Sequence, residues 1–487
     1  MKKANLFREC RDRVMKFSAG PRFQLPKLPG ASLPVQVFTS TYYDTPNYQL
    51  AQLGITFRRR VLKGQGLWQL KLPPGVARIE LEIPGGQHPP APFTDLLFAL
   101  QRHHDLTPIV KIHTRRTGIL VQGLEGPLAE VVLDRMSGRD RSNLIWRSSE
   151  IDISLKGGDK STLSQLSQVL RDTGAQDVDP RPKMFQALNL QFSQPAPSRD
   201  PDASILDHLG FMLQQQAKNL LLHDPGTRLG EDAEELHQMR VAVRRLRAFL
   251  RVARPVLAVD WANLLRTELA WLADIQGSVR DYDVLMQNLQ HEIPTLAVKD
   301  RPVLERLLGT FEHQRSAARA TMLEGLRSPR YLKLLDTLDQ ISPIPPLIVS
   351  DISLVDLAAK EFQKLCRSIR KPKIPSQDED WHQIRIFVKH VRYGTELVEA
   401  VVGKKASRFL RQVKKLQDFL GQHQDAAMTE QFLCKTLQQS RSLKAAFIIG
   451  QIVERLRTRR QFDRDRFDRE WRKVKKRGQE AWTFSEP

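Results

Sequence analysis

Two stretches of this 487-residue chain decide its fold: LHQMRVAVRRLRAFL (236–250) and WHQIRIFVKHVRYGT (381–395). They align residue by residue, with histidine, glutamine and arginine in the same order. Further along, LADIQGSVRDYDVL (272–285) aligns with LQDFLGQHQDAAMT (416–429) at nearly the same offset. Such a repeat indicates a duplication, and the helical periodicity of both copies predicts two similar helical bundles related by approximate symmetry.

Placed on a helix, the first copy gathers its basic residues on one face. At about 100° per residue they fall within an arc of roughly 80°, and they are His237, Arg240, Arg244, Arg247 and Arg251. The second copy repeats the arrangement with His382, Arg385, Lys389 and Arg392. No acidic residue is interleaved to relieve the repulsion between them. A solvated basic face is one interpretation, but the same order in both copies favours a site for a phosphate-rich polyanion.

The composition also points to an anionic partner. The chain has 76 Lys and Arg against 55 Asp and Glu, a formal net charge of +21. This excess suits nucleic acid, polyphosphate, a nucleotide or an acidic membrane. Aromatic residues make up only 7% and are not interleaved with the basic stripes. Since no helix-turn-helix, RNA-recognition or zinc-finger pattern is present, we expect nucleic acid only as a non-specific competitor.

The cysteines and the hydropathy of the chain indicate the cellular compartment in which it works. Cys10, Cys366 and Cys434 are far apart and form no CxxC pair, which favours a reducing environment without disulfides or structural zinc. The N-terminus lacks the pattern of a secretory signal. The apolar stretch AFIIGQI (446–452) is too short to span a bilayer and is expected to face a helical core. We therefore expect a cytoplasmic protein with no membrane partner.

The character of the chain changes near residue 200. Before it, short β-type runs alternate with Gly and Pro turns, with helices expected near 93–104 and 161–174. SQPAPSRDPDAS (193–204) is typical of a linker. We therefore place one domain at 1–195, the linker at 196–204 and a helical domain at 205–480. The segment ISPIPPLIVSD (341–351) divides that domain into repeats at about 205–340 and 352–480.

The two aligned pairs of segments in the helical half resemble the CHAD domain, the conserved histidine α-helical domain. The resemblance spans about 205–480 and implies two four-helix bundles that bind inorganic polyphosphate through a basic surface. Carried over residue by residue, it points to the two basic stripes. The copies are not equivalent, because His390 stands in the second where Arg245 stands in the first.

The N-terminal half resembles the CYTH, or triphosphate-tunnel, domain. STYYDTPNYQLAQLGITFRRR (40–60) is similar to that family's Y-x-D-T…L-R-x-R segment, and GLWQLKLP, ARIELE, KIHTRR, AEVVLD and EIDISLKGG follow in the family's order. The resemblance implies a closed antiparallel barrel that holds triphosphate and Mg²⁺ or Mn²⁺. The implied triphosphate ligands are Arg58, Arg60, Lys71, Arg115, Lys156 and Lys183. The implied metal ligands are Glu80, Glu82, Glu130, Asp134, Glu150 and Asp152.

The sequence departs from the CYTH pattern at its start. The family opens with Glu-x-Glu-x-Lys, whereas RECRDRVMKF (8–17) offers Glu9 and Asp12, three positions apart. We therefore expect a degenerate or weak triphosphatase-like barrel and assign no catalytic residue. Together the two halves predict an α+β multidomain chain whose helical domain binds polyphosphate, and association with polyphosphate granules is an expectation that follows from this. The alternative is an active Mg²⁺- or Mn²⁺-dependent inorganic or nucleoside triphosphatase.

Overall fold

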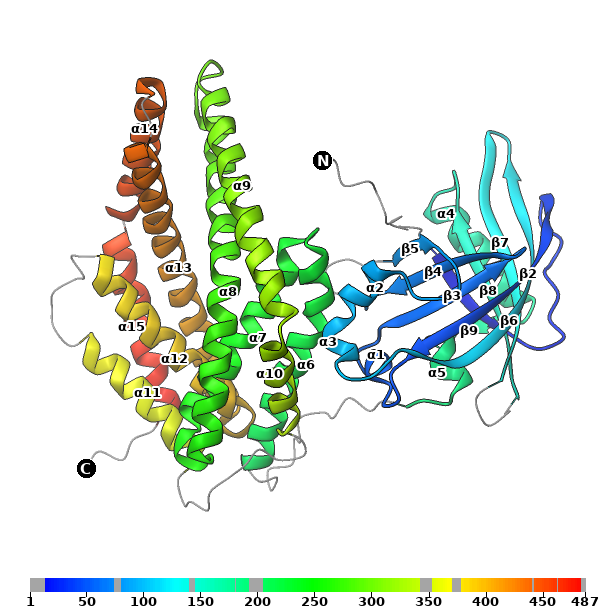
Figure 1. The fold of residues 1–487 in the computed structure, drawn as a ribbon, viewed down its shortest axis with the longest axis horizontal. Coiled ribbons are helices and arrows are strands. Elements are labelled where there is room, and N and C mark those ends of the chain that lie inside the picture. The colour runs from blue at the N-terminus through cyan, green and yellow to red at the C-terminus, as the bar shows by residue number, and fades with distance from the viewer. Residues whose placement is uncertain are drawn as a thin grey trace. The chain divides into compact units, whose positions relative to one another are not determined.

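Alternating apolar and polar residues in the first part of the chain, and 3.6-residue periodicity in the second, produce two different architectures (Figure 1). The computed structural model describes residues 14–73, 80–139, 145–179, 181–191, 205–341, 353–369, 378–439, 442–461 and 463–482. The chain forms two units, Met1–Gln194 and Pro195–Pro487. An antiparallel sheet unit precedes a helical unit, which confirms the predicted fold class. The expected linker at 196–204 and most of the expected divider at 341–351 lie outside the described residues.

The first unit is built on one nine-stranded sheet in the order β5-β4-β3-β2-β6-β7-β8-β1-β9, with every neighbouring pair antiparallel. The strands are β1 (Val14–Ala19), β2 (Gly30–Asp44), β3 (Thr56–Leu62), β4 (Gln65–Lys71), β5 (Glu80–Pro84), β6 (Thr107–Gly123), β7 (Gly126–Arg139), β8 (Ile145–Leu155) and β9 (Gln176–Asp177). The short helices are α1 (Gln49–Gln52), α2 (Ala91–Leu96), α3 (Phe98–Gln101), α4 (Lys160–Asp172) and α5 (Lys183–Ala187). The expected helix near 93–104 thus appears as two short helices.

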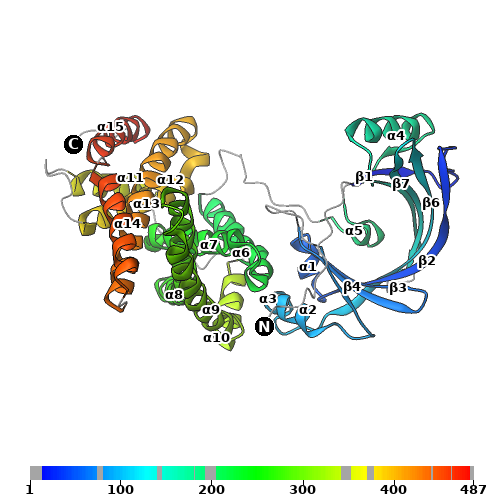
Figure 2. The ribbon, with the colours of Figure 1, turned by 90° about the horizontal axis from the view of Figure 1, so that it is seen from above.

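The expectation of a closed barrel is wrong for the described residues. The sheet ends at β5 on one side and β9 on the other, and no pairing joins these two edges. β9, at one of these edges, contributes only two residues. Figure 2 shows the sheet as an open trough with α5 on its concave side.

Side-chain alternation gives the two faces of the trough different roles. On the convex face, Phe17, Val131 and Ile151 pack with Leu166 and Leu170 of α4. The intervening residues of the same strands point to the concave face, where α5 packs. One face therefore builds a core, and the other is available for a polar site.

The Y-x-D-T segment at the end of β2 has a structural explanation. The Asp44 carboxylate is fully buried and accepts hydrogen bonds from the backbone N–H groups of Thr45 (2.7 Å), Leu50 (3.0 Å) and Ala51 (3.0 Å). These bonds fix the turn through α1 that leads into β3. Asp44 thereby sets the position at which the arginine-rich strand β3 begins.

The second unit is entirely helical in its described residues. The first repeat contains α6 (Ile205–Leu229), α7 (Ala233–Val252), α8 (Val259–Glu292), α9 (Arg301–Leu326) and α10 (Pro329–Asp339). The second contains α11 (Leu354–Ser368), α12 (Asp378–Val402), α13 (Lys404–Gln439), α14 (Leu443–Gln461) and α15 (Asp463–Ala481). Each repeat therefore adds a fifth helix to the expected four: α10 packs against α8, and α15 packs against α13.

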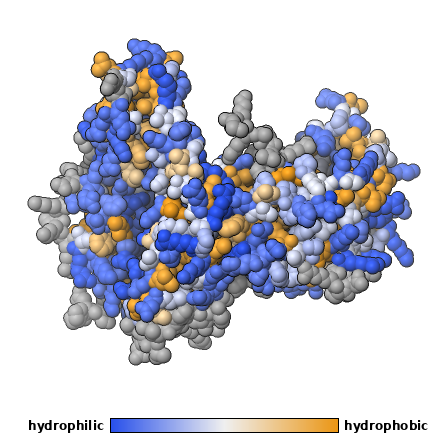
Figure 3. All heavy atoms as spheres, in the orientation of Figure 1, coloured by the Kyte–Doolittle hydropathy of each residue, from blue (hydrophilic) through white to orange (hydrophobic). Residues whose placement is uncertain are grey.

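The two repeats share a hydrophobic core where their long hairpins meet. Leu289 of α8 and Phe311 of α9 belong to one cluster with Leu433 of α13 and Ile449 of α14. The expectation that 446–452 faces a core is confirmed, because Ile448, Ile449 and Ile452 are buried in this cluster. In the described parts of the chain, no helix combines the length and hydropathy needed to cross a membrane. In the view of Figure 3, the surface is mostly hydrophilic with scattered hydrophobic residues.

A buried ion pair connects α6 to the end of its repeat. Arg228 Nε donates to Asp224 Oδ1 at 2.5 Å, and both side chains are fully buried. Arg228 Nη2 also donates to the carbonyl of Leu326 (2.8 Å), while the Tyr331 hydroxyl donates to Asp224 Oδ2 (2.8 Å). This network fixes α6 to α9 and α10.

We expect Asp224→Ala to lower the free energy of unfolding of the helical unit by about 3–5 kcal/mol, because it leaves the Arg228 guanidinium buried without its carboxylate. Urea unfolding followed by circular dichroism measures this change. The control is Glu268→Ala, which breaks the more exposed Glu268–Arg330 pair and should have a much smaller effect. Equal losses in the two variants would contradict the account.

Candidate functional site

A cavity of about 760 Å³ lies between the two repeats of the helical unit. Its walls come from the second half of α7, the first half of α8 and the middle of α12. The basic side chains in its lining are Arg244, Arg247, Arg251, Arg266, Lys389 and His390. Asp and Glu are absent from the described residues that line it. The cavity is therefore a concentrated positive region without an internal counter-charge.

Packing of α7 against α12 brings the two predicted stripes to this cavity. The core residues Val243 and Leu246 of α7 and Val388 and Val391 of α12 are buried, so the intervening basic residues turn toward the cavity between the helices. From the first stripe, Arg244, Arg247 and Arg251 line the cavity, and from the second, Lys389 does.

The other stripe residues lie outside the lining. Arg240 Nη1 donates to the carbonyl of Ala273 at 3.0 Å, and His382 Nδ1 lies 3.0 Å from Gln424 Oε1. Arg392 Nε pairs with Glu396 at 2.9 Å. The remaining two members of the stripes, also absent from the lining, are His237 and Arg385.

Arg266 and His390 line the cavity but were not predicted. Arg266 was hidden because the repeat alignment places Leu410 at its position in the second copy, so it forms no shared motif. For His390, the sequence shows only that it stands in the second copy where Arg245 stands in the first. Both residues come close to the stripe residues only because the helices pack against one another. The spacing of residues within one helix does not reveal such contacts.

Burial and repulsion between neighbouring cations lower the pKa values of two side chains in the cavity lining. Burial, together with the charges of Arg385, Arg244 and Arg240, lowers the pKa of Lys389 to about 7. Burial and the charge of Arg251 lower the pKa of His390 to about 4. An anion in the cavity would stabilise the protonated form of both side chains.

Some nitrogens around the cavity are also without partners. Arg244 Nε, Arg385 Nε and His390 Nδ1 are buried and have no hydrogen-bond partner among the described residues. An unsatisfied buried donor is costly, and a guanidinium Nε always carries a hydrogen to donate. Arg244, which lines the cavity, and Arg385, which lies outside the lining, therefore each carry a donor that the described residues do not satisfy.

A second polar region occupies the concave face of the sheet unit. Arg58 Nε donates to Gln69 Oε1 (2.7 Å), and its Nη1 donates to the Tyr42 hydroxyl (3.0 Å). Gln69 in turn donates to Glu82. Arg60 lies on the same face, with its guanidinium 3.8 Å from the centroid of the Phe38 ring. Burial and the nearby charges of Arg58 and Arg116 lower the pKa of Arg60 to about 10.

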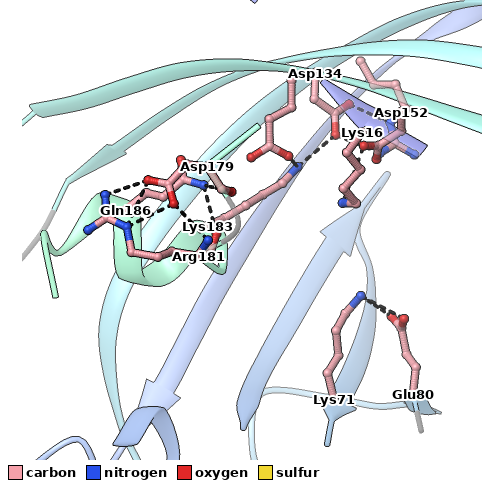
Figure 4. Close-up of polar contacts among 11 residues, drawn as sticks. Lys16, Lys71, Glu80, Asp134, Asp152, Asp179, Arg181, Lys183 and Gln186 are labelled. Carbon is pink, nitrogen blue, oxygen red and sulfur yellow. Dashed lines mark hydrogen bonds and ion pairs between the residues drawn. The ribbon is translucent and has the colours of Figure 1, made fainter. Parts of the chain in front are cut away.

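The carboxylates of this face are engaged by basic side chains (Figure 4). Arg116 donates to both Asp134 oxygens, from Nε at 2.7 Å and from Nη2 at 2.8 Å. Lys183 reaches from α5 to Asp134 (3.4 Å) and Glu150 (3.1 Å). Burial would raise the pKa of Asp134, but Arg116 and Lys183 outweigh it and hold that pKa below its usual range. Lys16 pairs with Asp152 at 3.5 Å.

The remaining predicted residues of the sheet unit are distributed as follows. Lys71 pairs with Glu80 at 2.8 Å, and Lys156 pairs with Glu130 at 3.3 Å. Arg115 is the exception: it is exposed and lies on the convex face. Its neighbour Arg116 pairs with Asp134 across the sheet and occupies the concave face. Because KIHTRR contains two adjacent arginines, the sequence alone does not tell which of Arg115 and Arg116 faces the concave side.

These carboxylates do not fit a divalent metal centre in the described structure. Mg²⁺ and Mn²⁺ require several oxygen ligands around one point. No three His, Cys, Asp or Glu side chains are grouped to hold a metal in the described parts of the chain. The six predicted ligands instead have Arg, Lys or Gln partners. The further candidates Glu9 and Asp12 lie outside the described residues.

Comparison with known proteins agrees with both sequence resemblances, which are thereby confirmed. The family model described as CHAD domain matches residues 212–434, and that described as CYTH domain matches residues 16–179. Uncharacterized protein Rv2226 of Mycobacterium tuberculosis is 28% identical over 436 residues, covering 82% of each chain.

Two solved structures are similar to the chain. PptA from Streptomyces chartreusis is 23% identical, covering 55% of this chain and 98% of that one, with a TM-score of 0.46. The CHAD domain of the plant Ricinus communis is 24% identical, covering 56% of this chain and 92% of that one, with a TM-score of 0.45.

The Lys389 ammonium predicts how anion binding in the cavity depends on pH. It loses its proton as the pH rises through about 7, so the affinity for a polyvalent anion should fall over that range. A bound anion favours the charged form, so the midpoint in the complex should lie above 7. Isothermal titration calorimetry with pyrophosphate at several pH values measures this dependence. Lys389→Arg keeps the charge and should flatten the profile; an unaltered profile would exclude Lys389 as the group responsible.

Proposed function

This chain joins a CYTH domain to a CHAD domain, and we propose that it binds inorganic polyphosphate, or a similar phosphate polyanion, in the basic cavity of its helical unit. Both domain families indicate a phosphate-related function. The observation that carries the more specific proposal is the cavity itself. Four arginines and Lys389 line it without an acid among the described lining residues.

The cavity has a suitable size and chemistry. Its volume of about 760 Å³ falls within the range of roughly 300–1,000 Å³ that is common for ligand sites. Arginine presents a rigid fork of donors that matches phosphate geometry, while lysine contributes a compact charge. Tyr393 is the single Phe, Trp or Tyr among the described lining residues, and it is buried, so it offers little surface on which a base could stack. The lining therefore favours phosphate groups over nucleobases.

A repeating anion suits the arrangement better than a single phosphate. The cations of α7 follow one another at intervals of one helical turn, and α12 adds Lys389 from the other repeat. Arg240 and His237 continue the row along α7 toward its N-terminus. Successive phosphates of one polymer could therefore contact successive cations of both repeats.

The proposal is tested by the salt dependence of polyphosphate binding. Binding should weaken steeply with salt because it releases counterions, and each lost phosphate contact should reduce the slope of log K against log salt by about one. We expect Arg247→Gln/Arg266→Gln to weaken binding of labelled long-chain polyphosphate and to lower that slope, as measured by fluorescence anisotropy.

The matched control is Arg306→Gln/Arg472→Gln, which removes two exposed arginines from α9 and α15. It changes the net charge equally but leaves the cavity intact, so it should have little effect on either quantity. If both double variants weaken binding to the same degree, the cavity is not the binding site and the protein attracts polyphosphate only through its net charge.

For the sheet unit we propose weak triphosphatase activity at most. Its arginines suit an oligophosphate, but Lys183, Lys16 and Arg116 already neutralise the carboxylates that would hold a catalytic metal. In a colorimetric phosphate assay with Mg²⁺ or Mn²⁺, we expect at most slow release of phosphate from tripolyphosphate or ATP. Rapid, multiple-turnover release that depends on the metal and that Glu150→Ala abolishes would establish the alternative, an active triphosphatase.

A further inference from the structure

A second basic hollow lies on the second helical repeat, between α13 and α15. Its volume is about 440 Å³. Four cations come from the first half of α13 and one from α15: Arg408, Arg411, Lys414, Lys415 and Arg477. None of them belongs to the two stripes or to the cavity between the repeats. The hollow is therefore distinct from the cavity between the two repeats (the central cavity).

The charges of this hollow are poorly compensated. Asp418 is the one acid in the described lining. Arg477 pairs with Glu480 at 2.5 Å, and Arg477 and, to a smaller extent, Arg408 lower the pKa of that carboxyl. Of the four cations of α13, Arg411, Lys414 and Lys415 have no ion pair with an acid in the described parts of the chain. Several of these four are three or four residues apart on one helix, so they repel one another. An anion in the hollow would relieve this repulsion.

The equivalent place in the first repeat is built differently. The offset that aligns Asp274 with Asp418 places Glu268 opposite Gln412 and Trp271 opposite Lys415. In the first repeat, Arg330 of α10 donates to Glu268 at 2.6 Å and lies 4.5 Å from the centroid of the Trp271 ring. One arginine is thus neutralised by a carboxylate and covered by an indole.

The second repeat lacks both of these features. Gln412 and Lys415 stand in place of the acid and the aromatic residue. Arg411 and Lys414 stand where the first repeat has Thr267 and Ala270, two uncharged residues that line the cavity between the repeats. The second copy therefore has an open hollow with five cations from two helices, where the first copy has an arginine paired with a carboxylate. Such a difference is expected if only the second copy carries a binding site here.

From this geometry we propose that the hollow between α13 and α15 is a second anion site, for a short condensed phosphate such as pyrophosphate or tripolyphosphate. Its volume lies in the lower part of the range of roughly 300–1,000 Å³ for small ligands. Arginine forks and lysine ammonium groups together match closely spaced phosphates. The described lining contains no aromatic residue that could hold a base. The site does not depend on polyphosphate binding in the central cavity.

Lysine footprinting on the full-length chain tests the proposal residue by residue. An acetylating reagent is applied with increasing tripolyphosphate, and mass spectrometry follows each lysine. We expect slower modification of Lys414 and Lys415, with no change at Lys435 and Lys475, which are exposed on the same two helices outside the hollow. Sulfate at matched ionic strength should protect neither pair.

Two variants make the result decisive. Arg411→Gln should raise the tripolyphosphate concentration for half-maximal protection about tenfold, as expected for loss of one charge-assisted hydrogen bond. Arg244→Gln/Lys389→Gln weakens the central cavity and should leave protection of Lys414 and Lys415 unchanged. Unprotected Lys414 and Lys415, equal protection of all four lysines, or loss of protection in the central-cavity variant would each overturn the proposal.

Discussion

The helical unit depends on one constraint: α7 and α12 pack together through apolar residues and thereby bring their basic faces around one cavity. Val243 and Val388 are fully buried, while Arg244 and Lys389 line the cavity. Like charges held close together destabilise the unliganded state. The pKa of Lys389, lowered to about 7, is the clearest sign of this repulsion. The shared core of the hairpins, with residues such as Phe311 and Leu433, is what offsets this cost.

The two units treat charge in opposite ways. In the sheet unit, opposite charges meet on the concave face, as when Arg116 binds Asp134 and Lys183 joins Asp134 to Glu150. In the helical unit, the cations of the central cavity face no acid within its described lining. The paired carboxylates of the sheet unit leave little capacity for a metal. Of the cations that line the cavity, Arg251 pairs with Glu361 from outside the lining, and the lining itself offers no acid to the others. This difference in charge is why we propose anion binding for the helical unit and only weak hydrolysis for the sheet unit.

Much of the fold was predictable because the repeat and the strand alternation depend on local periodicity. The same periodicity placed Arg244 and Lys389 on faces that line one cavity in the structure; their role in binding stays a prediction. It failed where long-range geometry decides. Whether the edge strands β5 and β9 pair and close the sheet is one such case, and the choice between Arg115 and Arg116, which depends on strand register, is another. Arg266 could not be predicted because it reaches the cavity from a third helix, α8, and has no basic counterpart in the second repeat.

The central claim is that a phosphate polymer neutralises the cations of the cavity between the repeats, whose described lining residues include no acid. The most direct measurement is the pKa of Lys389 itself, followed by NMR of isotopically labelled lysine with and without polyphosphate. The account predicts a pKa of about 7 in the free chain and a clear rise when the polymer is bound. A pKa near the usual lysine value in the free chain, or one that does not move on addition of polyphosphate, would contradict it.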